Sequence, residues 1–213
     1  MFGVSDGLVS NVGLILGVAG ADPSPSVVRV AGLAGLIAGA ISMAAGEYNS
    51  MKVQTELLER ELEMERIELR RNPHVEKVEL TQIYQSRGLD ADRARDLADE
   101  MMRDPEIALQ THAREELGID PNSLGSPIQA ALWSLVAFTV GAFVPLAPWF
   151  FIGHGGAIAA SLVLAFITAV VVGVLTARFT ARPPAMIVAR QVLFTLVPAA
   201  ITFAIGRAIG TSV

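Results

Sequence analysis

One stretch of the chain decides the fold. Residues 27–71 read VVRVAGLAGLIAGAISMAAGEYNSMKVQTELLERELEMERIELRR. Val27–Gly46 is mostly apolar and, at roughly 1.5 Å per residue, is long enough to cross a hydrocarbon core of about 30 Å. Glu47–Arg71 has no glycine or proline and is dense in Glu, Arg, Leu and Met, which favours a charged continuation of the same helix. The stretch therefore predicts a helix that crosses a membrane and continues beyond it.

The composition also points to a bilayer as the solvent. Of the 213 residues, 52% are hydrophobic and only 17% are charged, and the mean hydropathy is +0.50, unlike an ordinary soluble domain. The formal net charge of -5 gives no electrostatic basis for binding nucleic acid. Because the chain has no cysteine, thiolate chemistry is excluded, and any metal must be held by oxygen, imidazole or thioether ligands.

Four more apolar runs bring the number of expected spans to five. They are Phe2–Ala21, Ile128–Phe151, Ala157–Leu175 and Ile187–Ile209. No basic segment precedes the first run, so it is expected to be a retained span and not a removable signal peptide. The predicted fold class is an all-α integral membrane protein with five transmembrane helices.

Between the second and third spans the chain is charged and is expected to form a separate helical domain. The predicted division is 1–47 for spans one and two, 48–127 for the insert, and 128–213 for spans three to five. Asn72-Pro73 should end the long helix, because proline disfavours helical geometry in the residue before it. Further helices are expected over 74–86, 90–102 and 105–117.

The distribution of basic residues predicts the orientation. Nearly all Lys and Arg lie in the 51–120 region and in the connection that carries Arg178, Arg182 and Arg190. When five helices alternate, both segments fall on one side, which the positive-inside rule makes cytoplasmic. The insert and the N-terminus are therefore expected in the cytoplasm.

Three side chains on the first two spans, two carboxylates and a thioether, are candidates for ligands along an ion path. Asp6 lies inside the first span, where a carboxylate costs at least about 2.5 kcal/mol unless it faces a polar cavity or a partner. Met43 and Glu47 are four residues apart and share one helical face. A thioether with carboxylates suits a borderline metal such as Fe(II). The alternatives are that Asp6 lies at the headgroup boundary and that Met43 is packing.

The insert carries the sharper pattern. Glu65 and Glu68, three residues apart, precede the Asn72-Pro73 turn, and Glu76 and Glu79 repeat that spacing after it. A hairpin at the turn is expected to bring the two pairs together. His112 and Glu116 stand four apart on a later helix. Like charges at these spacings repel one another, a cost that a bound dication reverses.

A solvated acidic helix is the alternative reading of the insert, with basic neighbours that neutralise it: Arg60, Arg66, Arg70 and Lys77. His74 and His154 have no identifiable paired ligand and are expected in loops. A di-iron oxidase would need Glu-x-x-His motifs on paired helices, and Glu65–Glu79 contains none. We therefore do not expect an enzyme.

Three short motifs together with the Glu-rich insert resemble the vacuolar iron transporter family. They are SDGLVS at Ser5–Ser10, AGAISM at Ala38–Met43 and VPL at Val144–Leu146. The resemblance covers essentially the whole chain. It implies a homodimer with five spans per subunit and proton-coupled export of Fe(II) from the cytoplasm. In a bacterium the corresponding membrane is the plasma membrane.

The resemblance also implies residue roles. Asp6 and Met43 match the carboxylate and methionine on the family's translocation path. The glutamates of its cytoplasmic metal-binding domain are matched by Glu65, Glu68, Glu76, Glu79 and Glu116. Plant members have two adjacent methionines where this chain has His112 and Ala113, so His112 is expected to act as an imidazole ligand instead. They also have a glutamate where this chain has Gly35, which leaves Glu47 as its replacement.

Together these features predict a proton-coupled transporter that exports Fe(II), with Mn, Co or Zn as alternative ions at the same sites. Two rival functions stay open. A passive metal channel would conduct without regard to a proton gradient. A membrane-tethered metal buffer or sensor would bind metal through its insert and transport none.

Overall fold

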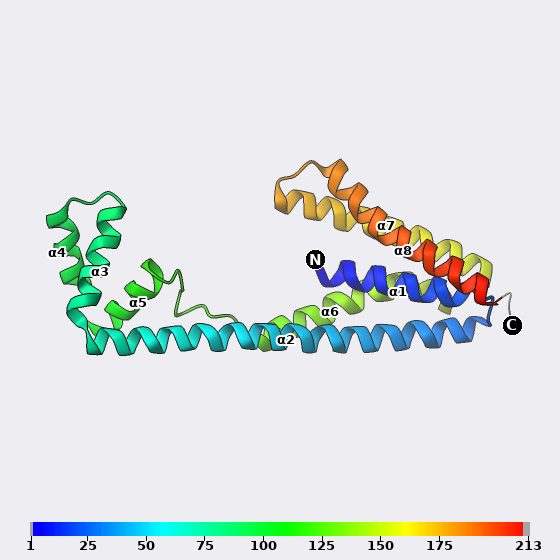
Figure 1. Cartoon of the computed structure of the whole chain (residues 1–213). Coiled ribbons are helices and arrows are strands. Elements are labelled where there is room, and N and C mark those ends of the chain that lie inside the picture. Colours follow the sequence, from blue (N-terminus) through cyan, green and yellow to red (C-terminus); the bar gives the residue numbers. More distant parts are fainter. Residues whose placement is uncertain (1, 211–213) are drawn as a thin grey trace. The chain divides into compact units, whose positions relative to one another are not determined.

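The computed structural model describes residues 2–210, and within that range the chain is all-helical, as predicted (Figure 1). The elements are α1 (Phe2–Gly20), α2 (Pro25–Arg71), α3 (Pro73–Ser86), α4 (Ala91–Met101), α5 (Pro105–Glu115), α6 (Pro127–Leu146), the short 3-10 helix η1 (Ala147–Phe150), α7 (His154–Thr180) and α8 (Pro184–Gly210).

Five of these helical segments are long and apolar enough to cross a membrane, which confirms the predicted number of spans. They are α1, α2, α6 with η1, α7 and α8. The predicted third span, Ile128–Phe151, agrees within one residue at each end with the observed Pro127–Phe150. Within it α6 ends at Leu146 and is followed by η1, which contains Pro148. One predicted span is too short, because the fourth runs from His154 to Thr180.

The chain divides into two compact units. One, here called the insert unit, is Asn49–Pro127, and the other, the membrane unit, consists of the described residues on either side of it. Helix α2 runs without a break through the boundary between Tyr48 and Asn49. Local sequence explains this continuity, because no glycine or proline follows Gly46 until Pro73.

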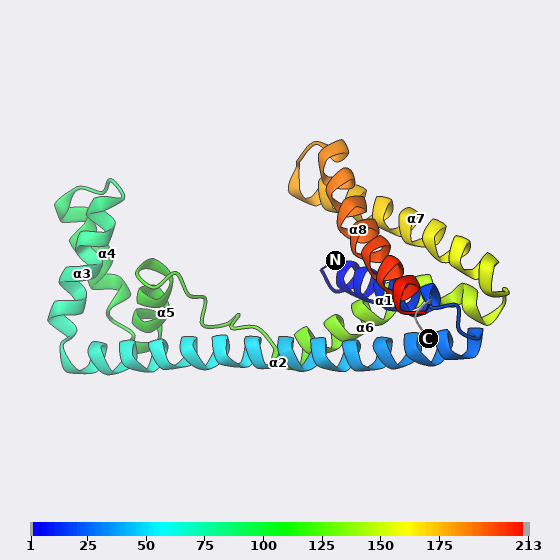
Figure 2. The same cartoon turned by 45° about the vertical axis from the view of Figure 1, so that its right-hand side comes forward.

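Helix α1 is the centre of the membrane unit, and α8 and α7 pack along it (Figure 2). Its apolar residues Leu8, Val12 and Ile15 are fully buried. Glycines bring the helices close. A Cβ on Gly7 would collide with the backbone of Phe138 in α6, and a Cβ on Gly20 with that of Phe203 in α8. Small residues at helix contacts are the usual means of packing helices in lipid.

The outer surface of the membrane unit is apolar. Phe151 is 86% exposed, Phe179 80% and Trp133 74%. A soluble monomer rarely exposes so many large apolar side chains, whereas a lipid-facing surface requires them. The chain is therefore a membrane protein.

The insert unit is a small helical assembly in which α3 and α4 lie side by side and α5 contacts both (Figure 1). Leu80 and Tyr84 of α3 pack on Ala94 and Ala98 of α4. Each helix begins where its sequence supplies a start signal. Asp90 accepts a hydrogen bond from the Arg93 amide at the start of α4, and prolines stand in the first turns of α3 and α5.

Candidate metal centre

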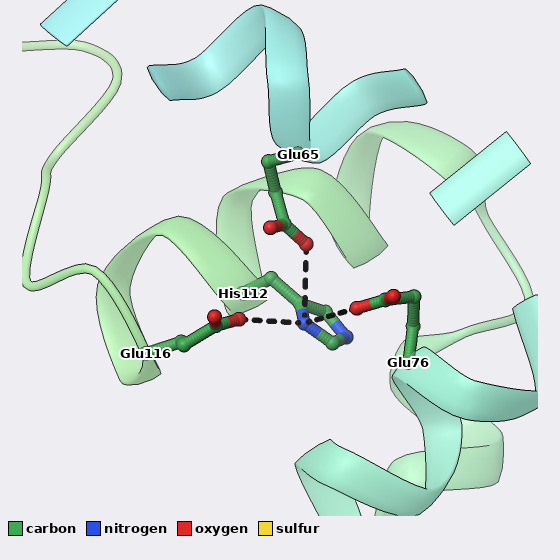
Figure 3. Close-up of side chains that lie close together, drawn as sticks. All are labelled: Glu65, Glu76, His112 and Glu116. Carbon is green, nitrogen blue, oxygen red and sulfur yellow. Dashed lines mark ion pairs between the residues drawn. The ribbon is translucent and has the colours of Figure 1, made fainter. Parts of the chain in front are cut away.

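Four side chains of the insert unit meet at one point (Figure 3). Glu65 comes from α2, Glu76 from the first turn of α3, His112 from α5, and Glu116 directly follows α5. Each offers one ligand atom, and these four atoms lie within 4.8 Å of one another. Ligands at about 2.0–2.2 Å from an ion lie up to roughly 4.4 Å apart. Small side-chain movements would therefore let the four hold one ion.

The turn after α2 brings the first two glutamates together. Asn72 ends α2, its amide donating to the Glu68 carbonyl at 2.8 Å, and Pro73 starts α3 immediately. The Asn72 carbonyl then accepts from the amide of Glu76 at 3.2 Å. This tight connection changes the direction of the chain between α2 and α3, and Glu76 and Glu65 face the same space (Figure 3).

Helix α5 supplies the other two ligands from one face. Its start is fixed by Asp104, whose carboxylate accepts hydrogen bonds from the amides of Glu106 at 2.8 Å and Ile107 at 3.1 Å. His112 and Glu116 follow one turn apart, as their spacing predicts. The position of the cap thus sets which side chains reach the site.

His112 lies at the centre of the four. Its Nδ1 atom is 3.3 Å from Glu65 Oε1, 3.5 Å from Glu116 Oε2 and 3.9 Å from Glu76 Oε2. The His112 side chain is fully buried and that of Glu65 is 3% exposed, whereas that of Glu116 is 29% exposed. The site is therefore closed on most sides and open to water beside Glu116.

Three polar atoms in this buried cluster lack a hydrogen bond. Among residues 2–210, Glu65 Oε1 and both ring nitrogens of His112 have no hydrogen-bond partner. A buried polar atom left unpaired costs about 1–3 kcal/mol, so native proteins seldom keep several together without a reason. A bound metal ion would satisfy such atoms, and three carboxylates with one imidazole suit a divalent transition metal.

Two glutamates of the cluster, Glu65 and Glu76, have raised pKa values. Burial raises the pKa of Glu65 from its ordinary value of 4.5 to about 7, and the charges of Glu116, Glu76, Glu68 and Glu79 add to this effect. The pKa of Glu76 is also raised, first by burial and then by Glu79, Glu68 and Glu116. A dication would offset both causes because its positive charge stabilises the ionised carboxylates, so metal and protons compete for this site.

Three of the basic residues suggested as neutralising groups pair with carboxylates outside the four. Arg66 and Arg70 pair with Glu63, and Lys77 pairs with Asp99. Arg87 pairs with Glu115, the carboxylate next to Glu116. These pairings disfavour the reading of Arg66, Arg70 and Lys77 as neutralising groups for a solvated acidic helix.

Glu68 and Glu79 flank the cluster without belonging to the group of four. Glu68 is exposed and Glu79 is half-buried. Their charges still act on the pKa of both Glu65 and Glu76. They therefore surround the buried site with further negative charge.

The membrane unit holds a second feature, a pocket of about 330 Å³ between α1, α2 and α6. Asp6 and Met43 both line it, together with the polar residues Ser10, Asn11 and Ser42. The two path residues predicted from sequence thus face one shared space. Glu47 is exposed on α2, one turn beyond Met43, and is not among the residues that line the pocket.

The two predicted loop histidines lie in helices, so that expectation is wrong. His74 is in the first turn of α3 and His154 is the first residue of α7. The glycines around His154 suggested a loop, but the Gly153 carbonyl accepts from the amide of Ala157 at 2.8 Å, and Ala157 is fully buried. Packing of this first turn outweighs the low helix propensity of glycine.

Sequence reasoning assigned no role to Asn11, a buried residue that lines the membrane pocket. The available signal was an amide side chain in an otherwise apolar span, next to Ser10. Such a polar group must find partners inside the protein.

Fold and site together define a five-span membrane protein whose inserted helical unit gathers carboxylates and one imidazole. Comparison with known proteins makes the class specific. The model of the VIT family matches residues 1–207, and the chain belongs to this family.

Curated relatives agree with this assignment. Vacuolar iron transporter 1 of Tulipa gesneriana is 30% identical, with 98% of this chain and 85% of the relative covered. Vacuolar iron transporter 1 of Arabidopsis thaliana is 31% identical over 86% of this chain and 74% of the relative. The vacuolar iron transporter of Acanthamoeba castellanii is 39% identical over 72% and 58%, respectively. These relatives are named as transporters, not as enzymes.

Proposed function

We propose that this protein exports Fe(II) from the cytoplasm in exchange for protons, with Mn, Co or Zn as alternative ions at the same sites. The observation that carries the proposal is the buried cluster of Glu65, Glu76, His112 and Glu116, in which three polar atoms lack a hydrogen bond. The names of the relatives, which are iron transporters, support iron as the cargo.

In this proposal the insert unit is cytoplasmic and collects the ion. The cluster binds it directly, and Glu68 and Glu79 attract ions to it and act as further ligands when more than one ion is held. Within the membrane unit, Asp6 and Met43 hold the ion in transit. Glu47, one turn from Met43, is the carboxylate that the ion meets beside the pocket.

Proton coupling is proposed from the chemistry of the ligands. A carboxylate that binds a dication must first lose its proton, so occupancy by metal and by protons is mutually exclusive. The raised pKa of Glu65 brings this exchange close to neutral pH. We further propose a homodimer in the plasma membrane of a bacterium, as the family resemblance implies.

Flux into proteoliposomes tests the proposal. Purified protein is reconstituted with a metal-sensitive dye inside, and Fe(II) is added with and without a pH gradient. Parent protein is expected to take up Fe(II) faster with the gradient, and the double variant Asp6→Ala, Met43→Ala should lose uptake. Met186→Ala is a matched control, because Met186 is an exposed methionine on α8. Equal uptake by the double variant and the parent would refute the assignment.

The same experiment separates the rival functions. Uptake that is unaffected by the pH gradient would identify a passive channel. Metal binding by the full chain without any uptake would identify a tethered buffer or sensor. In that case Glu65→Gln should lower metal binding, whereas Glu63→Gln should not, because the Glu63 carboxylate pairs with Arg66 and Arg70 at the surface.

A further inference from the structure

Asn11 is the most buried polar side chain among those that line the membrane pocket. It is 2% exposed and lies on α1, between the pocket and α6. Its Nδ2 atom donates a hydrogen bond to the carbonyl oxygen of Ala142 at 2.7 Å. Because a carbonyl oxygen can only accept, the amide nitrogen must face α6. The orientation of the amide is thereby fixed, and its oxygen faces elsewhere.

The Asn11 Oδ1 atom has no hydrogen-bond partner in the part of the chain that the structure describes, and it is buried. It faces α2, since a Cβ added to Gly35 would lie 3.2 Å from it. Gly35 lines the same pocket as Asp6 and Met43. A buried amide oxygen without a donor is rare in native proteins, and Asn11 is one of the residues that line the pocket, where a cation would supply the missing partner.

We propose that Asn11 Oδ1 is a ligand of the ion in transit, beside the Asp6 carboxylate and the Met43 thioether. The inference rests on the proposed function, because it takes the pocket as the ion's path. An amide oxygen adds a hard ligand without adding charge, which favours Mn(II) over a softer ion such as Zn(II). A neutral ligand also lets the ion leave, as conduction through a membrane site requires.

The competing role for Asn11 is a purely structural link between α1 and α6 through its hydrogen bond to Ala142. Two substitutions separate the roles. Asn11→Leu keeps the branching and the number of side-chain heavy atoms and removes both the donor and the oxygen. Asn11→Met removes both as well, but supplies a thioether in place of the amide oxygen. Because soft thioethers favour Zn(II) over Mn(II), only a ligand role predicts a change in metal preference.

The control variant is Thr202→Val. The Thr202 hydroxyl donates to the Gly13 carbonyl at 2.7 Å, so its removal also costs one hydrogen bond between a side chain and the backbone of a neighbouring helix. Thr202 is not among the residues that line the membrane pocket that contains Asp6 and Met43. A loss of packing alone should therefore affect Thr202→Val and Asn11→Leu similarly.

The test measures Mn(II), Fe(II) and Zn(II) uptake by reconstituted full-length variants, with thermal unfolding in detergent as the check on folding. Asn11→Leu is expected to raise KM for Fe(II) and Mn(II) by about tenfold, while Thr202→Val leaves it unchanged. Asn11→Met should raise KM for Mn(II) more than KM for Zn(II). Unchanged KM in Asn11→Leu, or equal changes for both metals in Asn11→Met, would overturn the proposal.

The failures of the two proposals can be told apart. Asp6→Ala is measured beside the Asn11 variants. If Asp6→Ala abolishes uptake and the Asn11 variants behave like Thr202→Val, only the role of Asn11 is refuted. If Asp6→Ala with Met43→Ala transports normally, the pocket is not the path and both proposals fall. If Asn11→Leu does not fold, the Asn11→Met variant tests the ligand role alone: a larger rise in KM for Mn(II) than for Zn(II) supports it, and equal changes refute it.

Discussion

Replacing Glu65 by glutamine should stabilise the metal-free insert unit at alkaline pH. The carboxyl of Glu65 is buried among other carboxylates, and its pKa rises from 4.5 to about 7. Because the folded chain holds this proton more tightly than the unfolded chain, stability falls as pH rises from 4.5 to 7. At about 1.36 kcal/mol for each pH unit, the loss above pH 7 is about 3 kcal/mol. A glutamine side chain carries no charge at either pH, so the Glu65→Gln variant should avoid most of this loss.

Hydrogen exchange of the full-length protein in detergent measures this effect locally. After treatment with a chelator, backbone amides of α3 and α5 are compared at pH 5 and pH 8. Parent protein should lose protection at pH 8, and Glu65→Gln should retain it, with a gain of up to about 3 kcal/mol in the free energy of local opening. Adding Mn(II) at pH 8 should restore protection to the parent and have less effect on the variant.

Glu63→Gln is the matched control for this substitution. Glu63 lies on the same helix, but its half-exposed carboxylate pairs with Arg66 and Arg70, so its removal should change stability by at most about 1 kcal/mol. Equal protection of parent and Glu65→Gln at pH 8 would refute the reasoning, since it would mean that the cluster tolerates its charge without metal.

Single contacts lead to three further predictions. His112→Leu should weaken Mn(II) binding by at least about tenfold, because loss of a residue that merely supports a metal ligand already costs that much. Calorimetric titration measures the effect, with His74→Leu as the control. Asp104→Ala removes the cap of α5 and should cost about 1 kcal/mol of local stability, and unchanged exchange in α5 would contradict it. Gly7→Ala should destabilise the membrane unit by about 1–3 kcal/mol because its Cβ meets the Phe138 backbone. Gly46→Ala, with nothing within 4 Å, should not destabilise the protein and should melt at or slightly above the parent temperature, because Ala favours a helix interior over Gly.

Local sequence was enough to predict the helical class, the number of spans and the break at Asn72-Pro73. Hydropathy detects apolar runs of span length, and proline ends a helix wherever it follows a helical pattern. The change from α6 to η1 inside the third span and the ends of α7 were not predicted, because hydropathy does not report them. The 3-10 helix η1 contains Pro148, and α7 continues through Arg178 to Thr180 and ends at Ala181, whose φ is 50°.

The sequence predicted which residue types form the candidate site, but it could not predict which of these side chains come together in the folded protein. Spacing placed His112 and Glu116 on one face, and the turn placed Glu65 near Glu76. Which glutamates are buried depends on tertiary packing and not on spacing. Spacing therefore predicted both Glu68 and Glu76 as metal ligands, although Glu68 is exposed and Glu76 is only 6% exposed. Sequence also had no means to show that the Glu115 side chain turns to Arg87, or that the amide of Asn11 has a fixed orientation.

The glycine contacts suggest which wall of the membrane pocket can move. Helix α1 meets α6 and α8 backbone to backbone at Gly7 and Gly20, whereas Gly39 of α2 meets only the ring of Phe138, a side chain that can change its rotamer. We therefore expect α1 to stay in place and α2 to move when the membrane pocket opens. Since the chain has no native cysteine, engineered pairs can test this. Oxidising a pair that ties α1 to α8 should spare Fe(II) flux, and tying α1 to α2 should arrest it.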